Sequence, residues 1–207
     1  MPTFPGDTAL VMIDIQNDFC PGGALAVAGG DEIVAAVNAL QDRFAVRILS
    51  QDWHPADHSS FADNNDAEPF SMVEMSYGLQ VMWPRHCVQG STGAAFHSDL
   101  QTDSADLVIR KGFRAPIDSY SAFYENDKTT QTGLAGYLRE RGVDKLVMVG
   151  LATDFCVYFS AIDGVASGFG VTVLMDCCRA IDLDGSLAAA VADMEAKGVA
   201  MMDSGDL

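Results

Sequence analysis

The sequence predicts an α/β fold with three layers, in which a mostly parallel, six-stranded sheet carries helices on both faces. Six short apolar runs recur along the 207 residues, separated by stretches with helical spacing. Most runs are continuously apolar rather than alternating, as is typical of strands buried on both faces of a parallel sheet. The chain is long enough to bury a substantial core, and it contains no repeat or linker. We therefore expect a single domain over residues 1–207.

The elements follow one another in a β-α rhythm. The predicted strands are residues 8–13, 46–49, 106–109, 145–149, 171–175 and 199–202. Two helices are predicted from apolar residues at helical spacing, namely Ile33, Val34, Val37 and Leu40 in the first, and Leu187, Val191 and Met194 in the second. This alternation of strands and helices implies a sheet covered on both faces.

Residues 51–103 interrupt this rhythm. They are rich in Asp, Asn, His, Ser, Pro and Gly, and they hold both tryptophans and all four histidines. A long irregular insertion in a compact domain is more often functional than accidental. We expect it to carry a metal site and to contribute a pocket lid, and its part from Asp63 to Ser76 could also form subunit contacts in a homo-oligomer.

The charge and the cysteines narrow the class of protein. A formal net charge of −17 excludes nucleic acid and anionic membranes as partners, since both require a basic face. No apolar run reaches the roughly 20 residues of a membrane span, and the first residues do not resemble a signal peptide. The five cysteines include no CxxC pair, which favours a reducing compartment in which one thiol can do chemistry. We expect a cytoplasmic protein that acts on a small molecule.

Reactive side chains follow four of the predicted strands. Asp14 follows the first strand, Asp52 and His54 the second and Lys111 the third, and Cys156 begins the helix after the fourth. Ligands of open parallel sheets bind outside the carboxyl ends of the strands. These residues are therefore expected to gather at one edge of the sheet.

Cys156 is the candidate nucleophile of this group. A helix N-terminus favours the thiolate, and the backbone N–H groups of Ala152 and Cys156 could hold the oxyanion formed at an attacked carbonyl. Asp14 could take the thiol proton and return it to a leaving amine, and Lys111 could stabilise both anions. Taken singly, the three residues also fit a buried structural cysteine, a turn-capping aspartate and a solvated lysine.

The insertion supplies candidate metal ligands. Asp52 and His54 can face the same site where the chain leaves the second strand, because residues two apart in extended chain point the same way, and His86 adds a second imidazole. Carboxylate and imidazole suit zinc first, with iron or manganese as alternatives. His58 is either a further ligand or a residue that orients the loop by hydrogen bonding. A hydrogen-bonded loop without metal is the alternative reading of Asp52 and His54.

At this point the chain resembles the nicotinamidase/pyrazinamidase branch of the isochorismatase-like cysteine hydrolases, over nearly its whole length. Five segments carry the resemblance in the order typical of that branch: VMIDIQNDFCPGGAL (11–25), SQDWHPADHSSF (50–61), MWPRHCVQG (82–90), IRKG with IDSYSAF (109–112 and 117–123), and GLATDFCV (150–157).

The resemblance implies a Rossmann-like sheet and specific roles for the matching positions. Cys156 would be the nucleophile, Asp14 the proton shuttle and Lys111 the supporting cation. A cis peptide between Leu151 and Ala152 would aim the Ala152 amide at the oxyanion. The residues matching the metal ligands and the aromatic pocket walls are Asp52, His54 and His86, and Phe19, Trp83 and Tyr120, respectively.

The implied reaction is deamidation of nicotinamide to nicotinate and ammonia, and equally of pyrazinamide, through a cysteine thioester. One divalent ion would orient the ring through its nitrogen. Two alternatives on the same fold are a different small-amide or carbamoyl amidase, which should lack this metal set, and an isochorismatase-type hydrolase, which does not need the cysteine. An inactive binding protein would tolerate loss of a triad residue or ligand, yet all are present.

Overall fold

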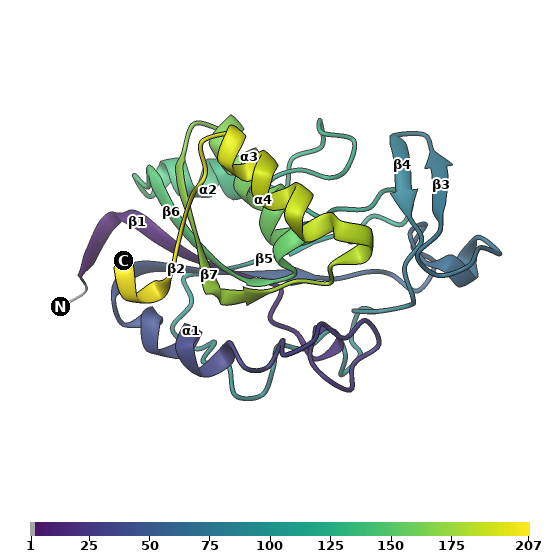
Figure 1. Cartoon of the computed structure of the whole chain (residues 1–207), viewed down its shortest axis with the longest axis horizontal. Coiled ribbons are helices and arrows are strands. Elements are labelled where there is room, and N and C mark those ends of the chain that lie inside the picture. The colour runs from purple at the N-terminus through teal and green to yellow at the C-terminus, as the bar shows by residue number, and fades with distance from the viewer. Residues whose placement is uncertain (1–2) are drawn as a thin grey trace.

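The computed structural model describes residues 3–207. Figure 1 shows a central sheet, with α1 on one side of it and α2, α3 and α4 on the other. In chain order the strands and helices are β1 (Phe4–Ile13), α1 (Val34–Gln41), β2 (Phe44–Asp52), β3 (Met72–Met75), β4 (Gly78–Val81), β5 (Leu107–Lys111), α2 (Leu134–Glu140), β6 (Lys145–Leu151), α3 (Tyr158–Ala166), β7 (Gly170–Arg179), α4 (Ser186–Ala196) and β8 (Ala200–Met202).

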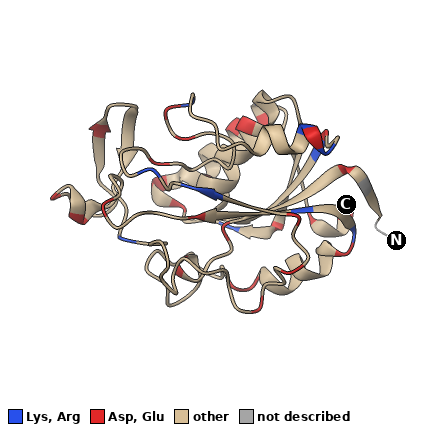
Figure 2. Ribbon diagram, turned by 180° about the vertical axis from the view of Figure 1, so that it is seen from behind, with Lys and Arg blue, Asp and Glu red and all other residues tan. Residues whose placement is uncertain are grey.

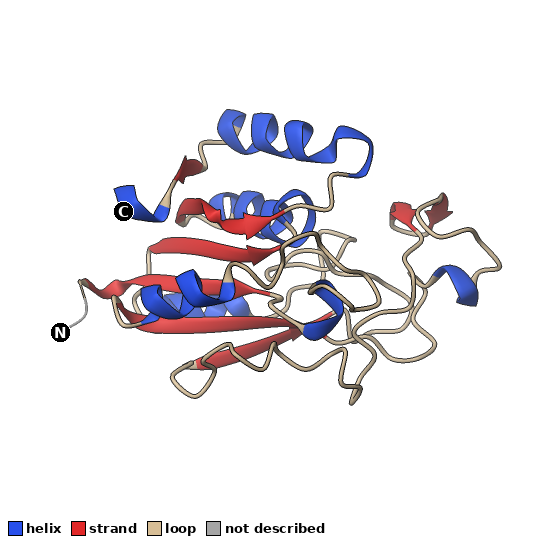
Figure 3. Cartoon of the chain, turned by 60° about the horizontal axis from the view of Figure 1, so that its bottom comes forward, coloured by secondary structure: helices blue, strands red, loops and turns tan. Residues whose placement is uncertain are grey.

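All six predicted strands are present in one sheet of order β5-β2-β1-β6-β7-β8, and every pairing in it is parallel. The predicted fold class is therefore confirmed. The register pairs Asp52 with Lys111 at the ends of β2 and β5, and Ile13 with Gly150 in β1 and β6. The carboxyl ends of four neighbouring strands thus meet, and most of the long loops lie at that end of the sheet (Figure 3).

Each face of the sheet has its own apolar core. Alternate residues of β1 show the division, because Leu10 and Met12 pack on the α1 side whereas Ala9 and Val11 pack on the side of α2, α3 and α4. These four side chains are fully buried. Continuous apolarity in the strands is thus explained by burial on both faces.

Gly150 allows β1 and β6 to come together beside Asp14. Its φ is +125°, and a Cβ at this position would lie 2.1 Å from the carbonyl oxygen of Ile13. Only glycine fits at this point, because both the backbone conformation and the neighbouring main chain exclude a side chain.

Two features were not predicted from the sequence. The insertion is not wholly irregular, since β3 and β4 form an antiparallel hairpin, which projects at the far end of the molecule from the two termini (Figure 1). The helix α2 has only seven residues and was also missed. Both elements are too short for their periodicity to stand out, and contacts with the rest of the chain stabilise them.

The acidic side chains are distributed over many elements rather than concentrated in one block (Figure 2). Within residues 3–207, no helix combines the length and the apolarity that a membrane span requires.

Candidate active site

The ends of β1, β2 and β5 bring a lysine and two carboxylates into contact. Lys111 Nζ lies 2.9 Å from Asp14 Oδ2 and 2.9 Å from Asp52 Oδ1. It also donates to the backbone carbonyl of Ser119 at 2.9 Å and lies 3.5 Å from Cys156 Sγ. All four side chains are buried, so their charges interact with little screening by water. The structure thus brings together the three residues predicted as a triad.

Cys156 lies between the end of β6 and the start of α3. A turn of π-helix (Thr153–Val157) precedes α3 and contains Cys156, and the Leu151–Ala152 peptide before it is cis, as the resemblance implies. Burial raises the pKa of the Cys156 thiol well above its ordinary value, and the nearby carboxylates add to this effect although Lys111 opposes it. The sequence-based prediction rested on the helix start, which favours the thiolate, and did not include the burial that opposes it. Desolvation penalises the charged thiolate, so removal of the thiol proton needs a base close by.

Asp14 is arranged to accept that proton. Its Oδ1 accepts a hydrogen bond of 2.7 Å from Ser50 Oγ, whereas the buried Oδ2 accepts no well-directed hydrogen bond from the described residues. Burial raises the pKa of Asp14, and although Lys111 opposes this, the Asp52 charge adds to it. A carboxylate with a raised pKa is a stronger base toward a thiol than an ordinary aspartate.

Lys111 remains a cation between the two carboxylates. Burial by itself would lower the pKa of its ammonium group, but Asp14 and Asp52 outweigh burial and hold that pKa well above its ordinary value. A buried lysine with two anionic neighbours is expected to keep its charge.

Next to Lys111, three donor atoms of the insertion and the β2 end converge. Asp52 Oδ2 lies 2.9 Å from His54 Nε2 and 3.4 Å from His86 Nε2, and all three side chains are buried. His54 Nδ1 lies 2.8 Å from the carbonyl oxygen of Gly112, and His86 Nδ1 lies 2.7 Å from that of Pro84. Since a carbonyl only accepts, Nδ1 of each ring carries a proton, and Nε2 is the atom of each ring that can bind a metal ion beside the carboxylate.

That geometry fits a metal ion. The Nδ1 contacts with backbone carbonyls orient both rings so that their Nε2 atoms and the Asp52 oxygen could share one ion. One aspartate carboxylate and two imidazoles are a donor set that binds zinc and related divalent ions. Asp52, His54 and His86 therefore have the chemistry of a metal centre, as the sequence predicted.

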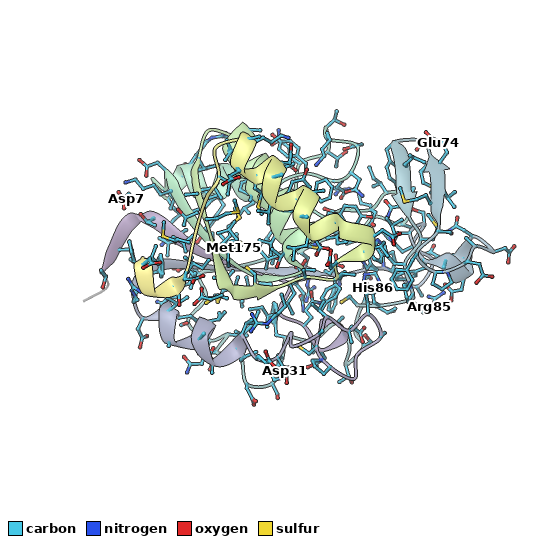
Figure 4. The ribbon with its side chains drawn as sticks, viewed as in Figure 1. Asp7, Asp31, Glu74, Arg85, His86 and Met175 are labelled. Atoms are coloured by element: carbon cyan, nitrogen blue, oxygen red, sulfur yellow. The ribbon has the colours of Figure 1, made fainter. Side chains whose placement is uncertain are left out.

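A short ladder of backbone hydrogen bonds brings His86 to this place. The N–H of His54 donates to the carbonyl of Cys87 at 3.0 Å, and the N–H of Gln89 donates to the carbonyl of His54 at 2.8 Å. The two segments are well separated in the sequence, and this pairing places His86 beside His54, with ring centroids 4.9 Å apart. Figure 4 shows His86 and Arg85 toward the end of the molecule that carries the hairpin residue Glu74.

His58 lies on the other side of His54, with their ring centroids 4.2 Å apart. Its Nε2 lies 3.2 Å from the carbonyl oxygen of Ile117, and its Nδ1 accepts from the N–H of Ser60 at 3.3 Å. Burial lowers the pKa of His58 to about 4, with the neighbouring His54 adding to the effect. Both of its nitrogens are engaged by the loop, so the orienting role is the better supported of the two predicted alternatives, although His54, His58 and Asp118 also form a group of close donors.

A small pocket opens beside these groups. It is lined by the predicted residues Asp52, His54, His86, Ala152 and Cys156 and by the predicted aromatic walls Phe19, Trp83 and Tyr120. The Trp83 and Tyr120 rings meet edge-on with centroids 6.2 Å apart. The aromatic rings leave only a narrow space between them, so the pocket suits a small flat molecule.

Several residues of the site were missed from the sequence. Leu25, Asp118, Phe155 and Ile181 also line the pocket. Ser50 and Gln16 support the carboxylates, since Gln16 Nε2 donates to the carbonyl of Asp52 at 2.9 Å and its Oε1 accepts from the Asp52 N–H at 2.8 Å. Ser50 lies two residues before Asp52 in the extended strand β2, and that spacing was an available signal. Gln16 gave no such signal, because the chain turns at Asp14, whose φ is +47°.

The fold and the site together define a class, the hydrolases with a parallel α/β sheet and a buried cysteine, aspartate and lysine beside an Asp-His-His centre. The isochorismatase-domain family matches residues 8–206. A nicotinamidase of Acinetobacter baylyi is 51% identical over 197 residues, with 95% of this chain and 92% of that protein covered. The chain therefore belongs to the isochorismatase-domain family.

Solved structures agree with this assignment. A nicotinamidase pyrazinamidase of Acinetobacter baumanii superposes with a TM-score of 0.97 at 52% identity, covering 98% of each chain. A protein of L. infantum in complex with nicotinate gives a TM-score of 0.86 at 38% identity, with 98% of this chain and 96% of that chain covered. A pyrazinamidase of Pyrococcus horikoshii in complex with zinc gives 0.78 at 33% identity, with 95% and 99% covered.

Gly112 packs against the His54 ring, so a side chain at this position is expected to lower metal affinity. A Cβ at Gly112 would lie 2.4 Å from His54 Cε1, so Gly112→Ala must displace the imidazole. We expect zinc affinity to fall about 10- to 100-fold, as when other supports of metal ligands are lost. Zinc content by elemental analysis and zinc affinity by competition with a chelator measure the effect.

The matched control is Gly90→Ala. Gly90 also has a positive φ, +77° against +62° for Gly112, but its Cβ would meet nothing within 4 Å. Both variants carry the strain of a left-handed alanine, and only Gly112→Ala touches His54. Equal zinc affinity in the two variants, with His54→Ala as the reference for a lost ligand, would contradict the assigned metal centre.

Proposed function

We propose that this protein is an amidohydrolase that deaminates nicotinamide to nicotinate and ammonia, and pyrazinamide in the same way. The observation that carries the proposal is one small pocket in which Cys156, three metal-ligand candidates and aromatic walls face the same space. The similarity to nicotinamidases, and to a structure holding nicotinate, supports a pyridine carboxamide as substrate.

The first half of the reaction forms a thioester. Asp14 takes the proton of Cys156, whose sulfur attacks the carboxamide carbon while Lys111 balances the negative charge. The oxyanion accepts hydrogen bonds from the N–H groups of Ala152 and Cys156. The carbon–nitrogen bond then breaks, the nitrogen takes the proton from Asp14, and ammonia leaves.

The second half consumes water. Asp14, again a carboxylate, takes a proton from a water molecule, and the resulting hydroxide attacks the thioester carbon. The carbon–sulfur bond breaks, the acid product forms, and the sulfur of Cys156 recovers its proton from Asp14. The net change is the amide and one water converted into the acid and ammonia.

Asp52, His54 and His86 would hold one divalent ion, and zinc is the proposed identity. The donor set supports it, as does the similarity to the zinc complex of the Pyrococcus horikoshii pyrazinamidase. When bound, such an ion supplies a Lewis-acidic position at which a ring nitrogen can be held. Iron and manganese are the alternatives, and elemental analysis of the isolated protein distinguishes them from zinc.

Two of the alternatives on this fold have weaker support. An isochorismatase-type reaction on a vinyl ether needs no nucleophilic cysteine, whereas Cys156 faces the pocket next to Lys111. A carbamoyl amidase should lack the metal ligands, whereas Asp52, His54 and His86 are gathered here.

Ammonia release by the purified protein tests the proposal. We expect kcat/KM for nicotinamide to exceed that for acetamide by a factor on the order of 10³ or more, because an aliphatic amide leaves the aromatic walls unfilled. Pyrazinamide should react at a rate comparable with nicotinamide. Rapid turnover of acetamide with little turnover of nicotinamide would overturn the substrate assignment.

A further inference from the structure

The β3–β4 hairpin contributes one buried amide, Gln80, that the proposed reaction does not use. Gln80 is 0% exposed, although Leu79 beside it in β4 is 66% exposed. Its Nε2 donates to Asp118 Oδ2 at 2.8 Å and to the Tyr120 hydroxyl at 2.8 Å. Its Oε1 accepts from Asn126 Nδ2 at 3.0 Å. A fully buried amide with this many partners joins the hairpin to the loop that follows β5.

These partners belong to the pocket wall. Asp118 and Tyr120 both line the pocket. The Tyr120 hydroxyl also accepts from Trp83 Nε1 at 3.1 Å, and the Tyr120 N–H donates to Asn126 Oδ1 at 3.1 Å. Gln80 therefore acts on both ends of Tyr120, directly at the hydroxyl and through Asn126 at the backbone.

The chemistry requires an amide at this position. Gln80 donates on the side of Asp118 and Tyr120, and accepts on the side of Asn126. A glutamate would lose the donors and add a second carboxylate beside Asp118, and a methionine would leave the buried partners without their hydrogen bonds. Only an amide of this length satisfies both sides.

We infer that Gln80 is a positioning residue, which holds the aromatic wall formed by Trp83 and Tyr120. Through Gln80, the β3–β4 hairpin sets the preference for ring amides. This inference rests on the proposed function. Within residues 3–207, the Gln80 side chain makes no hydrogen bond to a side chain of the triad or of the predicted metal ligands. Its loss should therefore weaken substrate placement while the chemical groups stay in place.

The test compares Gln80→Met with Gln41→Met. Gln41 is a matched control, because it is 1% exposed and bonds to Asn38, Ser104 and a backbone carbonyl away from the pocket. Both variants lose buried hydrogen bonds and some stability. In Gln80→Met alone, we expect KM for nicotinamide to rise roughly tenfold, the effect of losing one or two wall hydrogen bonds, with kcat changed less than about threefold. Its nicotinamide-to-acetamide ratio of kcat/KM should fall in parallel. Equal KM values for the two variants overturn the inference.

A double-mutant cycle with Tyr120→Phe tests whether Gln80 acts through the tyrosine. Tyr120→Phe keeps the ring but removes the hydroxyl that accepts from Gln80 and Trp83. KM should rise in this variant, and adding Gln80→Met should raise it by less than the sum of the two effects, since both changes remove the hydrogen bond between Gln80 and the Tyr120 hydroxyl. Fully additive effects overturn the inference. If Gln80→Met does not fold, an unchanged KM in Tyr120→Phe overturns it alone.

A spectroscopic measurement separates this inference from the proposed function. Trp53 and Trp83 are the two tryptophans, so a Trp53→Phe background reports on Trp83 alone. The emission of Trp83 should change with Gln80→Met and stay the same with Gln41→Met, whatever the substrate. If the wild-type protein releases no ammonia from nicotinamide, the proposed function fails, whereas superimposable Trp83 spectra overturn the role of Gln80.

Discussion

Replacing Cys156 with alanine is expected to lower kcat for amide hydrolysis by a factor on the order of 10⁴ or more, the size seen when a covalent nucleophile is removed. The sulfur lines the pocket and lies 3.5 Å from Lys111 Nζ. Without it, no thioester forms, and water must attack an unactivated amide directly. Ammonia release under saturating nicotinamide measures the loss.

The control for this variant is Cys177→Ala. Cys177 is also a buried free cysteine, but it lies in β7 within the apolar core on the α1 side. Its truncation costs stability through a small cavity and should leave kcat unchanged. Zinc content and the thermal unfolding midpoint show whether Cys156→Ala keeps its fold and metal. Turnover of that variant near the wild-type rate would remove Cys156 from the role of nucleophile.

The second large effect is expected for Asp14→Asn. Asparagine is nearly isosteric, so the fully buried position stays filled, and Lys111 keeps its contact with Asp52. The amide cannot take a proton from the thiol, whose pKa burial holds well above its ordinary value. General acid–base catalysis contributes about 10²–10⁴-fold, and we expect a loss at the upper end because Asp14 serves in both halves of the reaction.

The measurement for Asp14→Asn is kcat together with KM, since loss of proton transfer should lower kcat and leave KM nearly constant. Asp163→Asn is its matched control, because Asp163 also pairs with a lysine, Lys128, at 3.1 Å, but outside the pocket. An Asp14→Asn enzyme with kcat within threefold of the control would show that another group accepts the thiol proton.

The sheet could be predicted from the sequence because each strand is encoded locally. Continuous apolarity marks a strand buried on both faces, and six such runs became the six strands. The order β5-β2-β1-β6-β7-β8 could not be read in the same way, because it depends on which strands pair across long stretches of chain. The hairpin β3–β4 and the helix α2 were missed for a related reason, since short elements owe their stability to the surrounding structure.

The site divides in the same way. Asp14, Asp52, Lys111 and Cys156 could be chosen because the carboxyl ends of parallel strands meet at one edge. Gln80 could not be chosen, since a glutamine in an irregular insertion gives no local signal, and its importance comes from Asp118 and Tyr120.

The sequence by itself determined the strands, the reactive residues at their ends and the ligand types of the metal centre, because these depend on neighbours along the chain. The tertiary structure decided the surroundings of the Cys156 thiol, which folding buries beside Asp14 and Lys111 and whose pKa burial raises. It also decided how the pocket wall is held, through contacts between β4 and the loop after β5. Both depend on burial and on groups far apart in the sequence, and desolvation acts only once the chain has folded around them.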